Sequence, residues 1–244
     1  MLKVVLKVLI DTYTSGDNTV LVSDEFNIKI DFYGEWDDIL KDDFINSADF
    51  LSSLITNDIA PDGFDDLTIS ATLMEIDGEG AVLGRAGPTH VWDDNGVLDE
   101  NDLTSQAIME FDVADATNYE ELGLWDDIVL HEMIHTLGFG TLWDYHNLLE
   151  TTIDDNGTKK PVDDIVSAVF IGEDATYYND GINPLVETDG GEGTAYGHWD
   201  EETYTNELMT GYIDSDGMYL SNMTYGSLDD MSYEINYGAT VEIA

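Results

Sequence analysis

Hydrophobic and polar positions near the start of the chain predict a strand followed by a helix. From Phe26 to Gly34, apolar residues occupy alternate positions and many are β-branched or aromatic, which is typical of a half-buried strand. From Trp36 to Ile55, apolar residues recur at helical spacing, and this helix has to end before Pro61. A strand followed by an amphipathic helix is the pattern of a layered α/β sandwich.

Similar patterns predict more elements before residue 140. Segments 67–76 and 106–112 are strand candidates, and the glycine-dense segment 77–88 indicates an irregular or edge segment. The segment from about Asp126 to Gly138 is apolar almost all round, so it predicts a buried helix. The polar residues within that apolar coat are His131, Glu132, His135 and Thr136.

The second half of the chain shows less periodicity. Clusters of Gly, Asp and Asn between residues 140 and 197 predict a loop-rich region, followed by a helix near 224–231 and a short closing strand at 233–238. The opening residues 1–13 also resemble a strand, because Lys7 interrupts the apolar run and no small-residue cleavage site of a signal peptide follows. Residues 1–25 are therefore expected to form an N-terminal strand or tail.

No stretch approaches the roughly 18 apolar residues that a membrane span needs. The chain has 244 residues with 53 acidic and 7 basic side chains, a net charge of −46, which excludes a nucleic-acid binder held by phosphate contacts. Such self-repulsion is relieved by salt or divalent cations, so we expect a halophilic or calcium-stabilised protein. Acidic loops at 93–102 and 214–217 are candidate Ca²⁺ sites, although neither has the spacing of an EF-hand.

The segment HEMIH carries the clearest chemical signal. Its two histidines, His131 and His135, are four residues apart, so on a helix both rings project from one face and can bind one metal ion. The chain has no cysteine, so a metal has to be held by His and carboxylate, and neutral imidazoles favour zinc. Zinc would activate a water molecule, with Glu132 as its general base, which is the chemistry of metallopeptidases.

The residues alone do not decide which side chain is the third metal ligand. The short pattern HExxHxxGxxH would place it at Thr141, which is not a ligand type for zinc, and a glutamate on a following helix would fall near 154–155, where DDNG opposes a helix. Two downstream histidines remain, His146 and His198.

At this point the sequence resembles the leishmanolysin-type metzincin peptidases, especially their bacterial members. HExxHxxG at 131–138 is followed by a long insertion, then His198-Trp199 and a methionine segment at 207–211. Further similar segments lie at 82–89, 111–115, 138–143, 183–187 and 227–236, so that the resemblance covers about 26–244. By position it implies His131, His135 and His198 as ligands of one catalytic zinc, Glu132 as general base, Met209 as the Met-turn residue and Gly138 as the glycine at the helix exit.

The resemblance also implies a fold and a location. The fold would be of the α+β class, a metzincin-type zincin fold. Its upper lobe (about 26–138) would have a twisted mixed sheet with an active-site helix and a backing helix. The lower lobe (about 139–244) would be loop-rich with a C-terminal helix. Protein or peptide substrates would lie along an edge strand near 81–87, and the location would be extracellular or at a surface. Tyr212 would either hydrogen-bond the oxyanion or serve in packing.

Two classes of function therefore remain in view. The first is a zinc metalloendopeptidase that hydrolyses internal peptide bonds. The second is a catalytically idle zinc- or calcium-binding adhesion or structural module. Glu132 discriminates between them, because a purely structural zinc site has no need of a general base.

Overall fold

The structure is a computed structural model, and it describes residues 8–16, 25–60, 66–80, 82–92, 102–153, 165–191, 193–215 and 217–239. The chain divides into two compact units. The first comprises Met1–Trp92, Thr104–Leu137 and Val241–Ala244, and the second comprises Asp93–Leu103 and Gly138–Thr240. Within the described ranges, no helix is both long enough and apolar enough to cross a membrane.

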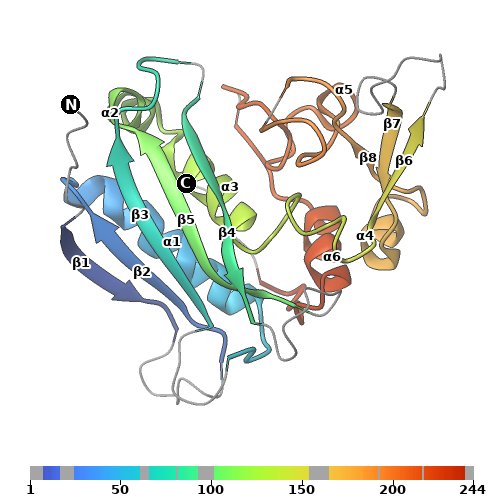
Figure 1. Cartoon of the computed structure of the whole chain (residues 1–244), viewed down its shortest axis with the longest axis horizontal. Coiled ribbons are helices and arrows are strands. Elements are labelled where there is room, and N and C mark those ends of the chain that lie inside the picture. Colours follow the sequence, from blue (N-terminus) through green and yellow to red (C-terminus); the bar gives the residue numbers. More distant parts are fainter. Residues whose placement is uncertain are drawn as a thin grey trace. The chain divides into compact units, whose positions relative to one another are not determined.

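A five-stranded mixed sheet forms the base of the first unit (Figure 1). The strand order is β1-β2-β3-β5-β4, in which β2, β3 and β5 are parallel and the two outer strands are antiparallel to their neighbours. The bounds are β1 Leu9–Thr14, β2 Ile28–Tyr33, β3 Leu67–Met74, β4 Gly84–Val91 and β5 Thr104–Asp112. The predicted strands at 26–34, 67–76 and 106–112 are confirmed, and β4 is an edge strand as the glycine-dense segment indicated.

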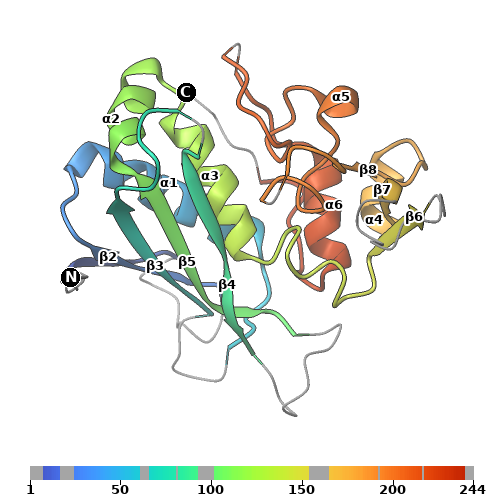
Figure 2. The same ribbon diagram turned by 45° about the horizontal axis from the view of Figure 1, so that its top comes forward.

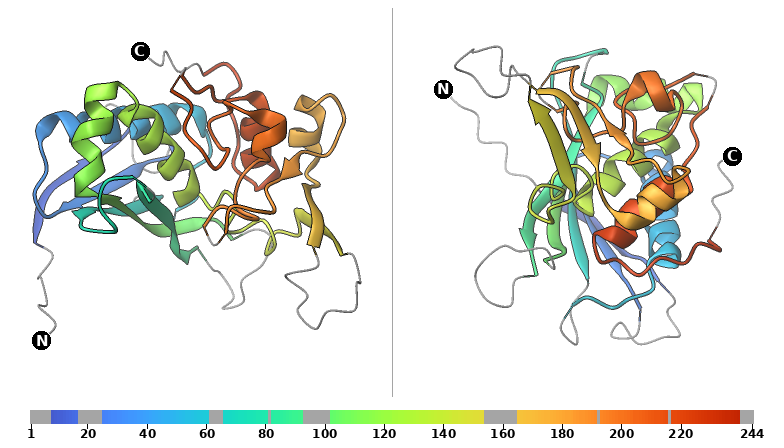
Figure 3. Two further views of the ribbon diagram at one scale, coloured as in Figure 1. Left: turned by 90° about the horizontal axis from the view of Figure 1, so that it is seen from above. Right: turned by 90° about the vertical axis from the view of Figure 1, so that its right-hand side faces the viewer.

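Three helices cover one face of this sheet, as Figures 2 and 3 show: α1 (Asp38–Leu54), α2 (Val113–Leu122) and α3 (Trp125–Thr136). The alternation in β2 explains the layering, because Ile28, Ile30 and Phe32 are buried while the residues between them are partly exposed. Aromatic rings fill the space between sheet and helices, namely those of Phe32, Trp36, Phe44, Phe111 and Trp125. The helices predicted at 36–55 and 126–138 are therefore confirmed.

The hydrophobic pattern of the sequence did not predict α2, although both ends of this helix have typical capping residues. Asp112 caps its start by accepting a hydrogen bond from the Ala114 N–H at 2.8 Å, and Gly123 ends it with a φ of +69°. Few residues of α2 are buried, so hydrophobic periodicity is weak there. Its presence places α3 directly after a tight turn at Gly123.

In the part of the second unit that the structure describes, the chain forms a small antiparallel sheet and three helices. Its strands are β6 (Leu149–Ile153), β7 (Ile165–Phe170) and β8 (Leu185–Val186), and its helices are α4 (Glu173–Tyr178), α5 (Glu201–Tyr204) and α6 (Asn222–Asp230). An aromatic core includes the stacked rings of Trp143 and Trp199, whose centroids lie 5.0 Å apart. Helices α4 and α6 approach closely, since a Cβ on Gly226 would lie 2.6 Å from the backbone nitrogen of Ala175.

One expectation for this unit is confirmed and one is wrong. The region 140–197 is loop-rich as predicted, although its described residues also hold the short elements β6, β7, α4 and β8. The closing strand at 233–238 is absent from the described residues there: Asn236 instead accepts from the Gly238 N–H at 3.1 Å and from the Ala239 N–H at 2.9 Å, which makes a turn. The helix near 224–231 is confirmed as α6.

Candidate metal centre

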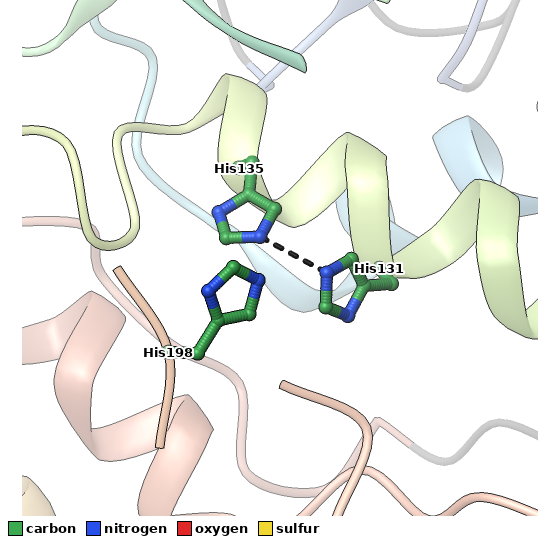
Figure 4. Close-up of side chains that lie close together, drawn as sticks. All are labelled: His131, His135 and His198. Atoms are coloured by element: carbon green, nitrogen blue, oxygen red, sulfur yellow. Dashed lines mark hydrogen bonds between the residues drawn. The ribbon is translucent and has the colours of Figure 1, made fainter. Parts of the chain in front are cut away.

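Helix α3 presents the two histidines of the HEMIH segment on one face (Figure 4). The Nε2 atoms of His131 and His135 lie 3.0 Å apart, as the four-residue spacing predicts. The helix ends at Thr136, and Gly138 follows with a φ of +100°, a backbone conformation that favours glycine. The apolar residues around the histidines are buried, so the two imidazoles are held on a rigid element.

His198 has its tautomer fixed by the backbone. Its Nδ1 lies 2.9 Å from the carbonyl oxygen of Thr194, and because a carbonyl only accepts, Nδ1 carries the hydrogen. The lone pair of Nε2 is then available to a metal, the usual arrangement for a histidine ligand. Burial lowers the pKa of His198, which keeps the imidazole neutral and suited to metal binding.

The three histidines form a group that could hold a metal ion. One ring nitrogen from each of His131, His135 and His198 lies within 4.8 Å of the others, as Figure 4 illustrates. Three imidazoles without thiolates fit the ligand set of a catalytic zinc, which uses three protein ligands and keeps a further position open. The donor chemistry therefore fits the metal that the sequence implies.

Glu132 lies beside His131 on α3 and is nearly buried, with an exposed fraction of 9%. Burial raises the pKa of its carboxyl group to about 8. A nearby cation would favour the ionised form and lower this pKa again. Burial and a bound cation would therefore act on the pKa of the Glu132 carboxyl group in opposite directions.

His146, the alternative third ligand, is outside this group of histidines. It is buried, and its Nε2 lies 3.1 Å from the carbonyl oxygen of Asp102, to which it donates. Asp102 and His146 both belong to the second unit, so this hydrogen bond is internal to that unit. The geometry favours His198 over His146 as the residue to test first.

The methionine segment contacts the residue after His198 through its backbone. Met209 is fully buried, its N–H donates to the Glu207 carboxylate at 2.6 Å, and its carbonyl oxygen accepts from the Trp199 N–H at 3.0 Å. Tyr212 has an exposed fraction of 55%, so burial gives no support to the packing alternative for its ring.

The sequence reading assigned no role to Glu207 or to Glu187, which both adjoin this segment. The Glu187 N–H donates to the His198 carbonyl oxygen at 2.9 Å, and its carboxylate accepts from the N–H groups of Thr188 and Asp189. An isolated acidic residue in a chain with this many carboxylates carries no distinguishing signal. Glu187 and Glu207 differ from most acidic residues of the chain in being buried, with exposed fractions of 5% and 0%.

The two acidic loops that are expected to bind Ca²⁺ lie partly outside the described residues, the first at 93–101 and the second at Asp216. Within the described ranges, the histidine group is the one set of side chains with metal-holding geometry. Calcium binding by this chain therefore stays a prediction.

Comparison with known protein families identifies the chain. The family model for leishmanolysin, a peptidase, matches residues 86–243, which is more than half of the chain. The chain belongs to the leishmanolysin family and is a metallopeptidase, an enzyme class that acts on proteins. Metallopeptidases of this family use zinc. The match includes α3 and the segments that carry His198 and Met209, whereas residues 1–85 lie before it. No curated protein matches this sequence.

Proposed function

We propose that this chain is a zinc metalloendopeptidase with a metzincin-type catalytic domain. His131, His135 and His198 hold the zinc ion, and Glu132 is the general base. The observation that carries the proposal is the group of three imidazole nitrogens within 4.8 Å of one another, with Glu132 next to the first of them in the chain. Membership of the leishmanolysin family supports it independently.

Zinc, when bound, supplies a Lewis acid that polarises the scissile carbonyl group and makes water a stronger nucleophile at neutral pH. Glu132 accepts the proton of the attacking water and passes it to the leaving amine. Its nearly buried position keeps bulk water from competing for that proton, and a bound zinc ion would lower the pKa that burial raises, so that the carboxylate is ionised and can accept the proton. Gly138 lets the chain turn out of α3 three residues after His135. Met209, the Met-turn residue, holds the backbone of Trp199 next to His198 through its carbonyl oxygen.

The substrate is an extended stretch of a protein chain. Strand β4 is the last strand in the order of the five-stranded sheet, so its outer edge offers backbone groups for pairing. A peptide segment that adds to this edge near residues 84–87 gains main-chain hydrogen bonds irrespective of its sequence. This mode of binding favours unfolded or loop segments over folded domains, because only they can present a free strand.

A direct test is the hydrolysis of unfolded casein by the purified chain in high salt, with and without 1,10-phenanthroline. We expect cleavage that the chelator abolishes. Glu132→Gln should lose cleavage by a factor of about 100 or more, as the loss of a general base implies, while it still binds zinc. Full activity in Glu132→Gln would refute this mechanism, and bound zinc without any cleavage would favour the idle binding module.

We also propose that the enzyme works outside the cell or at a cell surface, in a saline medium. The proposal is supported by the strongly acidic composition, with a net charge of −46. Members of the leishmanolysin family are typically secreted or surface-bound. Fractionation of the producing cells, followed by immunodetection, would test the location.

A further inference from the structure

Glu207 is a fully buried carboxylate in the second unit, and its contacts converge on the residue that follows His198. We propose that Glu207 is a positioning residue that fixes His198 for zinc through the Met-turn and through Trp199. This inference rests on the proposed function, because it takes His198 to be a zinc ligand. It assigns Glu207 no contact with substrate.

The carboxylate of Glu207 joins two segments of the chain. Its Oε2 accepts from the Met209 N–H at 2.6 Å, within the Met-turn. Its Oε1 accepts from Ser221, through N–H at 3.1 Å and through Oγ at 2.7 Å, and from the Thr224 hydroxyl at 2.5 Å. Ser221 is the N-cap of α6, so Glu207 ties the Met-turn to the start of that helix.

The directions of these hydrogen bonds are fixed. The Trp199 indole N–H can only donate, and it lies 2.8 Å from the Thr224 hydroxyl oxygen. Thr224 accepts there, so its own hydrogen points to Glu207, which has to accept it. The chain of donors therefore runs from Trp199 through Thr224 to Glu207, and an acceptor is needed at its end.

A second route leads from Glu207 to the same tryptophan through the backbone. The Met209 N–H is held by Glu207, while the Met209 carbonyl oxygen accepts from the Trp199 N–H at 3.0 Å. Trp199 is fully buried, so its side chain and its backbone are both anchored. Since Trp199 directly follows His198, these two routes limit how far the imidazole can move.

A buried carboxylate such as that of Glu207 is destabilised in its ionised form unless hydrogen bonds compensate for the loss of water. Burial raises the pKa of Glu207, while the hydrogen bonds from Thr224, Ser221 and Met209 favour its ionised form. A glutamine of the same shape would keep an oxygen for Ser221 and Thr224, but it would place an NH₂ group against the Met209 N–H. Two donors would then face each other, and the Met-turn would have to shift.

The test measures zinc affinity directly. We would remove zinc from the full chain and determine Kd by competition with a fluorescent chelator for the wild type, Glu207→Gln and Thr224→Val. We expect Glu207→Gln to bind zinc about 10- to 100-fold more weakly, as supporting partners of metal ligands usually do. Thr224→Val should weaken zinc binding in the same direction, because it breaks the link between Trp199 and Glu207 while nearly keeping the side-chain volume.

Asp230→Asn is the matched control. Asp230 also accepts two backbone N–H bonds in the second unit, from Asp174 and Ala175 at 2.9 Å each, but these lie at the start of α4. Its zinc affinity should match that of the wild type. Unchanged Kd values in both Glu207→Gln and Thr224→Val would overturn this inference alone. If the wild type itself binds no zinc, the proposed function fails, and the inference fails with it.

Discussion

The Glu132 carboxylate lies 3.1 Å from the point where a Cβ atom on Gly84 would stand. The ring of Phe111 is closer still, at 2.7 Å from the same point. Gly84 is the first residue of β4 and Glu132 belongs to α3, so a glycine at this position leaves the carboxylate room between the strand and the helix.

Gly84→Ala is therefore expected to impair catalysis more than zinc binding. The added methyl group has to displace either the Phe111 ring or the Glu132 carboxylate, and a small misplacement of a catalytic group costs up to about 100-fold in rate. We predict a 10- to 100-fold lower kcat/KM on a peptide substrate, on the order of that loss, with an unchanged zinc content. Gly238→Ala is the control, since its Cβ would meet only the Asn236 side chain, at 3.2 Å. Wild-type kinetics in Gly84→Ala would show that the base tolerates this crowding.

Gly138→Ala is expected to destabilise the fold. Gly138 combines a φ of +100° with crowding, since a Cβ would lie 2.5 Å from the Leu142 Cδ1 atom. Gly123 offers a matched comparison: its φ is +69°, and nothing lies within 4 Å of its Cβ position. We predict that Gly123→Ala costs about 1 kcal/mol of unfolding free energy in urea, and that Gly138→Ala costs about 2 to 4 kcal/mol. Equal losses in the two variants would contradict the crowding argument.

The partly buried position of Asp43 predicts that the stability of the fold depends on pH. Burial, followed by the charges of Glu120 and Asp126, raises the pKa of Asp43 to about 6. A carboxyl group with a raised pKa stabilises the fold when it is protonated, and this contribution is lost as the pH rises through about 6.

Replacing Asp43 with asparagine removes that loss. The gain in Tm of Asp43→Asn over the wild type should therefore be small at pH 4, should grow as the pH rises through about 6, and should level off above that range, which thermal scans from pH 4 to pH 8 would measure. The exposed neighbour Asp42 serves as a control, because Asp42→Asn should show a smaller gain. A gain for Asp43→Asn that does not change with pH would contradict this interpretation.

The net charge of −46 predicts a stability that depends on salt. Salt screens repulsion between carboxylates, and divalent cations screen it more strongly. We expect Tm to rise with added NaCl and to rise at lower concentrations with CaCl₂. Sucrose at equal osmolality separates charge screening from a general solute effect. A Tm that does not respond to either salt would refute the halophilic interpretation.

The sequence predicts the first unit well because its elements each bury one face. The alternation in β2 and the helical spacing in α1 are direct consequences of that burial. Helix α2 buries little, so only its caps, Asp112 and Gly123, carry a signal. In the second unit, β7 is apolar and β-branched, but the loop signals around it dominate the pattern.

Some residues of the candidate site could also be predicted from the sequence, and others could not. The spacing of His131 and His135 is local and can be read from the helix period alone. His198 is 63 positions beyond His135, so its selection over His146 depended on a resemblance, and the structure adds the proximity of the three imidazoles. Glu207 could not be recognised from sequence, because its importance comes from burial and from partners at 209, 221 and 224.

The most direct test of the account is the zinc content of the purified chain, measured by native mass spectrometry for the wild type, His198→Ala and His146→Ala. The account predicts about one zinc ion per chain in the wild type and in His146→Ala, as a single catalytic site implies, and little or none in His198→Ala. Zinc retained by His198→Ala, together with its loss from His146→Ala, would contradict the proposed ligand set.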